Sequence, residues 1–189
     1  MTTSITANHR GTDATMPPSP ARPRPDEYAD FYETYIAAVE GPLLEALEHD
    51  SGEWRDLLAS VPPGLEGHRY APGKWSIREV VGHVVDAERM FSVRAMAFAR
   101  GDRSHFPSFD ENAYAAASGA QRRPLANLAE ELAAVRRSTL LLLNSFEDET
   151  WDRRGTAAGY EFTVRSLAWI MAGHSRHHRG VVVERYLER

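Results

Sequence analysis

Apolar residues recur at helical spacing in four stretches of the chain, with turn-forming residues between them. The stretches cover residues 42–61, 76–100, 124–146 and 163–186. Side chains three and four positions apart share one face of a helix, so each stretch predicts an amphipathic helix with one buried face. Four such helices without a convincing strand pattern predict an all-α fold, a four-helix bundle.

The starts of these helices carry recognisable signals. Ser76 and Glu79 form a capping box, in which each side chain satisfies a backbone donor at the start of the second helix. Thr163 can cap the fourth helix. Pro42 and Pro124 suit the first turns of the first and third helices, because a proline there loses no helical hydrogen bond. Capping signals and periodicity therefore predict the same boundaries.

The segments between the helices are less regular. Residues 101–123 form a long connection between the second and third helices, which either crosses the bundle or covers a site. Residues 147–162 are turn-rich, and a hairpin is expected only in such links. The composition of residues 1–25 predicts a flexible tail ahead of a single domain over residues 26–189. The aromatic segment 28–36 is expected to pack as a short leading element or to form a partner face.

Composition and charge mainly exclude certain kinds of partner and metal ligand. The chain has 189 residues, 42% of them hydrophobic, and its net charge of −5 opposes a broad surface for nucleic acid or membranes. The absence of cysteine excludes disulfides and thiolate ligands, which leaves His, Asp and Glu as metal ligands. No apolar run is long enough to span a bilayer, and the N-terminus lacks a hydrophobic signal core. A cytoplasmic location is therefore expected.

The fourth helix carries histidines where a core should hold hydrocarbon. In the segment GHSRHH, His174 and His178 lie four residues apart on the apolar stripe, close enough for both rings to hold one metal ion. His83, at the margin of the apolar stripe of the second helix, can supply a third nitrogen. Three ligands leave a coordination position for water or substrate, as catalytic sites do. The alternative is that the histidines are hydrogen-bonded packing residues.

Neighbouring residues narrow the kind of site. Ser175 stands where a zincin protease carries the glutamate of its His-Glu-x-x-His motif. No Glu-x-x-His pair accompanies the three histidines, so a mononuclear site is favoured over a di-iron centre. His177 falls off the stripe and is expected at the edge of the site. Arg136, on the stripe of the third helix, could grip an anion or a buried carboxylate, but it is expected to extend its charge into water.

Three segments stand out together: YAPGKWSIREVVGHVVDAERMFSVRAMAFARGD, FDEN and TVRSLAWIMAGHSRHH. In order and spacing they resemble the DinB/YfiT-like family, with a match that spans residues 42–187. The resemblance implies a four-helix bundle, often dimeric, that binds a divalent ion such as nickel or zinc through His83, His174 and His178. Members of that family include thiol-dependent S-transferases and a mycothiol-dependent isomerase, and many others are described as metal-dependent hydrolases. The resemblance thus implies metal chemistry without selecting a reaction.

Asp110 and Glu111 match an acidic stretch of that family and could act as general base or as acceptors beside the metal. Acidic residues in a long loop can equally form a solvated turn or a helix cap. We therefore expect a mononuclear metal-dependent enzyme that activates water, as a hydrolase, or a low-molecular-weight thiol, as an S-transferase. It is expected to act on a small molecule as a homodimer. The alternative is a non-catalytic metal-binding or stress-associated dimeric binding module.

Overall fold

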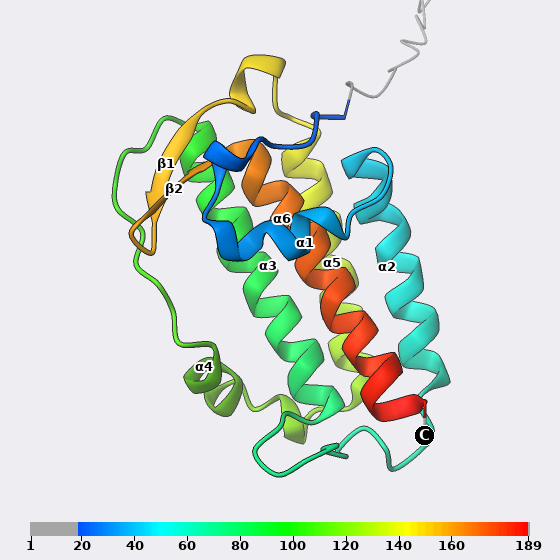
Figure 1. Cartoon of the computed structure of the whole chain (residues 1–189). Coiled ribbons are helices and arrows are strands. Elements are labelled where there is room, and N and C mark those ends of the chain that lie inside the picture. The colour runs from blue at the N-terminus through cyan, green and yellow to red at the C-terminus, as the bar shows by residue number, and fades with distance from the viewer. Residues whose placement is uncertain (1–18, 189) are drawn as a thin grey trace, which may run out of the picture.

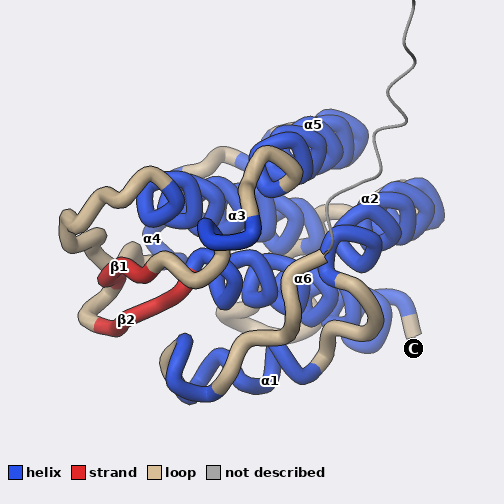
Figure 2. The backbone as a smooth tube through the Cα atoms, turned by 90° about the horizontal axis from the view of Figure 1, so that it is seen from above, coloured by secondary structure: helices blue, strands red, loops and turns tan. Residues whose placement is uncertain are grey.

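Four long helices lie side by side in the computed structural model, which describes residues 19–188 (Figure 1). They are α2 (Leu43–Ser60), α3 (Ile77–Ala99), α5 (Leu125–Leu143) and α6 (Val164–Val182). Each helix falls within one of the stretches of helical periodicity, so the predicted four-helix bundle is confirmed. Seen from above, α6 lies between α3 and α2, and the short helix α1 (Glu33–Ala37) lies outside it (Figure 2).

The helix starts follow the predicted caps. The Ser76 hydroxyl accepts a hydrogen bond from the backbone N–H of Glu79, whose carboxylate accepts one from the Ser76 N–H at 2.8 Å. Thr163 caps α6 in the same manner, by accepting a hydrogen bond from the first helical turn. Pro42 and Pro124 occupy the cap positions of α2 and α5, one residue before the first turn where the sequence predicts them.

The connections contain a short α-helix and a hairpin, besides 3₁₀ helices at Ala120–Arg122 and Asp148–Thr150. The helix is α4 (Glu111–Ala117) between α3 and α5, and the hairpin is formed by the antiparallel strands β1 (Arg154–Ala157) and β2 (Tyr160–Thr163) between α5 and α6. The hairpin lies in a link, where the sequence allows one, whereas α4 lacks a periodicity long enough to predict it. Phe106 pairs with Ala157 and so ties the loop after α3 to the hairpin. The long connection is thereby held along one side of the bundle (Figure 1).

The N-terminal segment of the described chain crosses the bundle (Figure 1). Helix α1 (Glu33–Ala37) packs on α6 at Gly173, where an added Cβ would lie 1.9 Å from the carbonyl oxygen of Tyr35. Glycine is therefore required for this approach of the two backbones. Tyr28 and Ile36 are buried, so much of the leading segment packs within the chain, while Phe31 is 56% exposed.

The first 18 residues of the predicted tail lie outside the described residues. The residues that follow contact the bundle: the Ser19 hydroxyl accepts a hydrogen bond from the Leu44 N–H, and Arg22 donates two hydrogen bonds to backbone carbonyls around α1. The Arg22 guanidinium also lies over the Trp169 ring, 4.8 Å from its centroid. Polar contacts of this kind do not register in the composition that predicts a tail.

A buried charge network joins the four bundle helices. Arg136 of α5, only 2% exposed, makes a bidentate pair with Glu88 of α3 and a hydrogen bond with Asp50 of α2. Asp50 also accepts hydrogen bonds from the Ser175 hydroxyl at 2.6 Å and from Arg179 Nε at 3.1 Å, both on α6. These five residues are called the charge network below. The prediction that Arg136 extends its charge into water is wrong, because its carboxylate partners come from two other helices.

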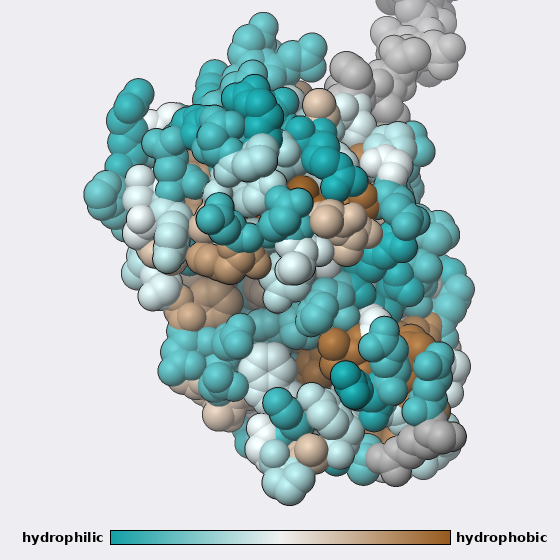
Figure 3. Space-filling model, in the orientation of Figure 1, coloured by the Kyte–Doolittle hydropathy of each residue, from teal (hydrophilic) through white to brown (hydrophobic). Residues whose placement is uncertain are grey.

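None of the helices within residues 19–188 is long and apolar enough to cross a bilayer. The face seen in Figure 1 is largely hydrophilic, with hydrophobic areas separated from one another (Figure 3). Exposed apolar residues in small separate areas are ordinary for a folded chain. The expected homodimer therefore stays a prediction.

Candidate metal centre

Three histidines from two helices meet inside the bundle. His83 projects from α3, and His174 and His178 project from α6, so that one ring nitrogen of each lies within 4.8 Å of the others. The Nε2 atoms of His83 and His174 are 3.0 Å apart, with one ring donating a hydrogen bond to the other. The structure thus brings together the three residues that the sequence selects. They are called the histidine cluster below.

The cluster lies at the level where two hydrophobic clusters of the core meet. On α3, His83 lies between Val80, which belongs to one of these clusters, and Ala87, which belongs to the other. On α6, His174 follows Met171, which belongs to the same cluster as Ala87. His83 and His174 are 3% and 7% exposed, and His178 is partly exposed. The apolar periodicity of both helices therefore carries the imidazoles inward.

Burial keeps these histidines neutral. It lowers the pKa of His83 to about 4 and, with repulsion from neighbouring imidazoles, the pKa of His178 to about 3. The pKa of His174 is also well below its usual value, again through burial first and neighbouring rings second. A neutral imidazole has a free lone pair, which is the form that binds metal ions. Within residues 19–188, no carboxylate hydrogen-bonds any of the three rings.

The donor set fits one divalent ion. Two nitrogens bound to a tetrahedral zinc ion at about 2.0–2.1 Å lie about 3.3 Å apart. The separation of 3.0 Å between His83 Nε2 and His174 Nε2 is close to that value. The third donor, on His178, lies within 4.8 Å of the other two. Three imidazoles without thiolates suit zinc, nickel and similar ions.

A cavity of about 280 Å³ opens beside the cluster. Its walls are mostly aromatic, its polar groups are few, and it reaches His83 and His174 directly. The lining residues include Phe31, Tyr32, Tyr35, Phe91, Arg94 and Glu111. Ligand sites commonly combine apolar walls with a small number of placed polar groups. A small molecule in this cavity would therefore lie against two of the three metal donors.

Aromatic rings enclose the cluster on other sides. The Tyr35 ring lies 5.4 Å from the rings of His174 and His177, measured between centroids, and Gly173 allows that approach. The Trp75 ring lies 4.7 Å from the His83 ring. His177 is exposed, with its ring 5.1 Å from that of His178. It therefore lies at the edge of the cluster, where the sequence predicts it.

The two acidic candidates occupy different positions. The Asp110 carboxylate caps α4 by accepting hydrogen bonds from two backbone N–H groups of its first turn. Glu111 lines the cavity. Tyr32 and Tyr35 line the same cavity; burial raises their pKa values, and the negative charge of Glu111 contributes to both shifts. Glu111 therefore faces the site, and Asp110 orients the helix that presents it.

Arg94 is a charged residue of the cavity that the sequence analysis does not select. Arg94 lines the cavity and is 3% exposed. It follows His83 by eleven residues, which is three helical turns, so both side chains leave the same face of α3. This spacing could have indicated that Arg94 shares a face of the helix with His83. It does not stand out in the sequence, because an arginine at the margin of an apolar stripe is ordinarily expected to reach water.

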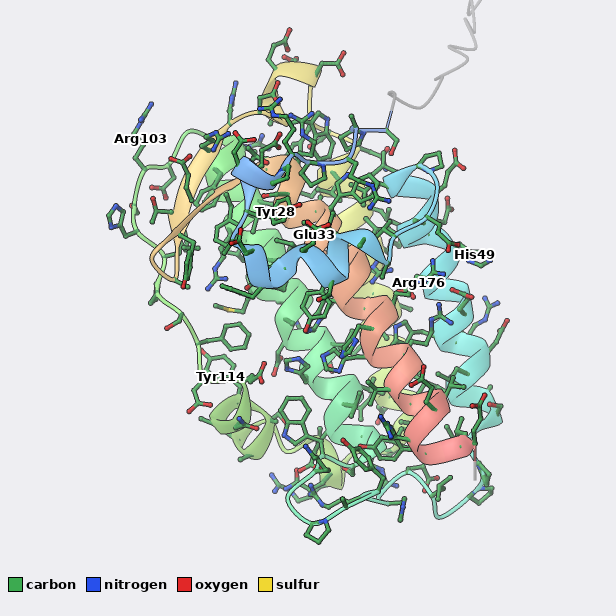
Figure 4. The ribbon with its side chains drawn as sticks, in the orientation of Figure 1. Tyr28, Glu33, His49, Arg103, Tyr114 and Arg176 are labelled. Carbon is green, nitrogen blue, oxygen red and sulfur yellow. The ribbon has the colours of Figure 1, made fainter. Side chains whose placement is uncertain are left out.

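A larger cavity, of about 530 Å³, lies apart from the histidine cluster. It is bounded by α2 and α6, where His49 and Arg176 are seen on the side of the bundle away from Tyr114 (Figure 4). Both of its arginines are already paired with carboxylates of its lining: Arg176 with Glu40 at 3.4 Å and Arg179 with Glu53 at 2.6 Å. The smaller cavity is therefore the one that the chemistry favours.

Comparisons with known proteins bear on this site. The model of the DinB superfamily matches residues 46–182, a range that contains all three histidines. The solved structure of YfiT from Bacillus subtilis is similar, with a TM-score of 0.67, 17% sequence identity, and coverage of 87% of this chain and 90% of that one. It is described as "a probable metal-dependent hydrolase with an unusual four-helix bundle topology". No match was found among curated proteins.

Proposed function

This chain belongs to the DinB superfamily, and from that premise we propose that it is a metal-dependent enzyme acting on a small molecule. His83, His174 and His178 hold one divalent ion, and the cavity beside them receives the substrate. The observation that carries the proposal is the meeting of three neutral imidazoles, two of them buried and one partly exposed, beside an aromatic cavity. An ion held there supplies Lewis acidity, which lowers the pKa of a water or thiol beside it and polarises an electrophile.

The chain's own residues supply the remaining functions. Burial keeps the three imidazoles unprotonated near neutral pH, so they bind the ion without competition from protons. Glu111 lines the cavity and accepts the proton that the nucleophile releases. Asp110 holds Glu111 in place by capping α4. Tyr35 and Trp75 pack against the histidine rings and limit the access of bulk water.

Water is our first choice of nucleophile, since the similar YfiT structure is described as a probable metal-dependent hydrolase. Transfer to a low-molecular-weight thiol is the other reaction that such a site supports. The two are separated by incubating metal-loaded protein with small esters and amides, and with thiol acceptors plus electrophiles. Product release without any thiol supports hydrolysis, whereas strict dependence on thiol supports transfer. Bound metal with neither activity would favour the non-catalytic binding module.

The ligand assignment is tested by metal analysis after reconstitution with zinc or nickel. Wild-type protein is expected to retain one ion per chain after desalting, and His83→Ala, His174→Ala and His178→Ala each much less. His177→Ala is the matched control, because it removes an exposed histidine beside His178 on the same helix. Its metal content is expected to equal that of the wild type. Equal metal content in all four variants would overturn the assignment.

A further inference from the structure

Arg94 is a buried arginine whose charge lacks a carboxylate partner among residues 19–188. Its side chain is 3% exposed, and its one hydrogen bond runs from Nη2 to the Pro107 carbonyl at 2.7 Å. Nε is enclosed by protein atoms and has no acceptor there. Burial lowers the pKa of Arg94. Arg136, which is equally buried, has two carboxylates around it.

A buried arginine with so few partners lowers the stability of the protein when no ligand is bound. A buried charge is tolerated when a counter-charge and hydrogen bonds replace the lost water, and Arg94 has received only one carbonyl. Nη1 and the second hydrogen of Nη2 remain available to an acceptor from outside the chain. Two Nη groups side by side form the fork that binds a planar carboxylate through two parallel hydrogen bonds.

The position of Arg94 connects this unused fork with the histidine cluster. Both His83 and Arg94 line the cavity of about 280 Å³. Their Cα atoms are about 16 Å apart along α3, because eleven residues rise by about 1.5 Å each. An extended small molecule therefore can meet the Arg94 fork at one end and the histidine cluster at the other.

The other walls define the rest of that molecule. They present the rings of Phe31, Tyr32, Tyr35, Phe91 and Phe109, and so suit an apolar or aromatic body. The charged lining residues are Arg94 and Glu111. A single guanidinium opposite a single carboxylate suits a monoanion, since Glu111 would repel a phosphate dianion.

We propose that the substrate carries a carboxylate that binds Arg94 and an apolar or aromatic body that fills the cavity. Its reacting group lies at the histidine cluster. Arg94 is thus the residue that selects the substrate class. The position of the reacting group of the substrate rests on the proposed function. The carboxylate site itself depends only on Arg94 and the cavity.

The test is calorimetric titration of the full chain with phenylacetate and with its neutral isostere phenylacetamide. Wild-type protein is expected to bind phenylacetate at least tenfold more tightly than the amide, and Arg94→Met to lose that preference. Arg94→Gln, which retains a donor for the Pro107 carbonyl, is a second variant with the same expected loss. Arg89→Met is the control, because it removes an exposed arginine of α3 that pairs with Glu131. It is expected to retain the preference.

A second readout does not depend on ligand or activity. Removal of an unpaired buried charge is expected to raise the thermal midpoint of Arg94→Met above that of Arg89→Met in the absence of ligand. Unchanged selectivity in both Arg94 variants would overturn the proposal, and so would tighter binding of inorganic phosphate than of phenylacetate.

Metal content measured on the same samples separates this proposal from the metal assignment. If reconstituted protein holds one ion per chain but shows no Arg94-dependent selectivity, only the carboxylate site is wrong. If protein offered zinc or nickel retains no ion but still shows that selectivity, the carboxylate site is supported and the metal assignment is wrong.

Discussion

The histidine cluster and the charge network are neighbours on α6, where His174 and Ser175 are consecutive residues, yet their polar groups are satisfied differently. In the charge network, Glu88 and Asp50 pair with arginines at distances between 2.9 and 3.2 Å. In the histidine cluster, the rings of His83 and His174 hydrogen-bond only to each other within the described chain. The polar groups of the charge network are therefore satisfied within the protein, whereas the histidine cluster has ring nitrogens that can still bind a metal ion.

This difference separates a structural cluster from a binding site. Buried polar groups are normally satisfied, so a buried group without partners needs a reason. The charge network has its partners on four helices and needs no ligand to explain it. Two of the three neutral imidazoles, His83 and His174, border the same cavity as the half-satisfied Arg94, and a metal ion and an anion would complete these groups. Four predictions test this division, ordered by the effect expected of each single step: one substitution, one bound ion, or one pH unit for one histidine.

Breaking the charge network should have the largest effect on stability. Arg136→Met leaves Glu88 and Asp50 buried without their shared cation, and we expect the free energy of unfolding to fall by about 3–5 kcal/mol. Urea denaturation measures the change. Arg137→Met, which removes the adjacent exposed arginine of α5, is the control and should change stability little. Equal stability of the two variants would contradict a structural role for the network.

A bound metal ion should stabilise the wild-type protein against unfolding, but not a variant that lacks one histidine of the cluster. An ion at a hundred times its dissociation constant adds about 2.7 kcal/mol to the free energy of unfolding. We expect His174→Ala to lose this gain, and His177→Ala to keep it. Thermal unfolding with and without zinc or nickel measures both. A gain that survives in His174→Ala would locate the ion elsewhere.

Acid should destabilise the metal-free protein through the histidines. In the unfolded chain histidine titrates near pH 6.5, whereas burial holds the folded pKa of His83 at about 4 and that of His178 at about 3. Below pH 6.5 the unfolded state therefore binds protons that the folded state does not. Stability present above that pH is lost as the pH falls toward the folded values, by up to about 1.4 kcal/mol per pH unit for each histidine.

The measurement for this prediction is the urea midpoint of chelator-treated protein between pH 7 and pH 4.5. His83→Gln removes one of the titrating groups, so its stability should fall less steeply with acid than that of the wild type. Parallel curves for the two proteins would show that His83 titrates normally in the folded state.

Ser175→Ala should have the smallest effect of the four. It removes the hydroxyl that donates to Asp50 and accepts from the Trp54 indole at 2.9 Å, while both arginine partners of Asp50 stay in place. We expect a loss of about 1 kcal/mol in the free energy of unfolding and an unchanged metal content. Ser92→Ala, which removes an exposed hydroxyl of α3, is the control. Loss of metal in Ser175→Ala would show that the two clusters are not separate.

Much of the fold is predictable from the sequence because its signals are local. The Ser76–Glu79 box and the Thr163 cap act within one helical turn, and apolar periodicity is likewise a property of each helix alone. Helix α4 is seven residues long, too short for periodicity to register. The crossing of α1 over Gly173 depends on two segments far apart in the chain, so no local pattern predicts it.

The candidate site follows the same rule. The pair His174 and His178 is visible in one helix, and His83 joins it because both helices turn an apolar face to one core. The partners of Arg136 could not be predicted, since Glu88 and Asp50 lie on other helices. The importance of Arg94 also depends on tertiary structure, because only the folded cavity shows that its charge is buried without a carboxylate.

The most direct test of the account is anomalous X-ray diffraction from crystals of protein reconstituted with zinc or nickel, measured at the absorption edge of the metal. We predict one strong peak per chain, within about 2.2 Å of a ring nitrogen of each of His83, His174 and His178. A principal peak elsewhere, such as between His49 and Glu53, or no peak at the three histidines, would contradict it.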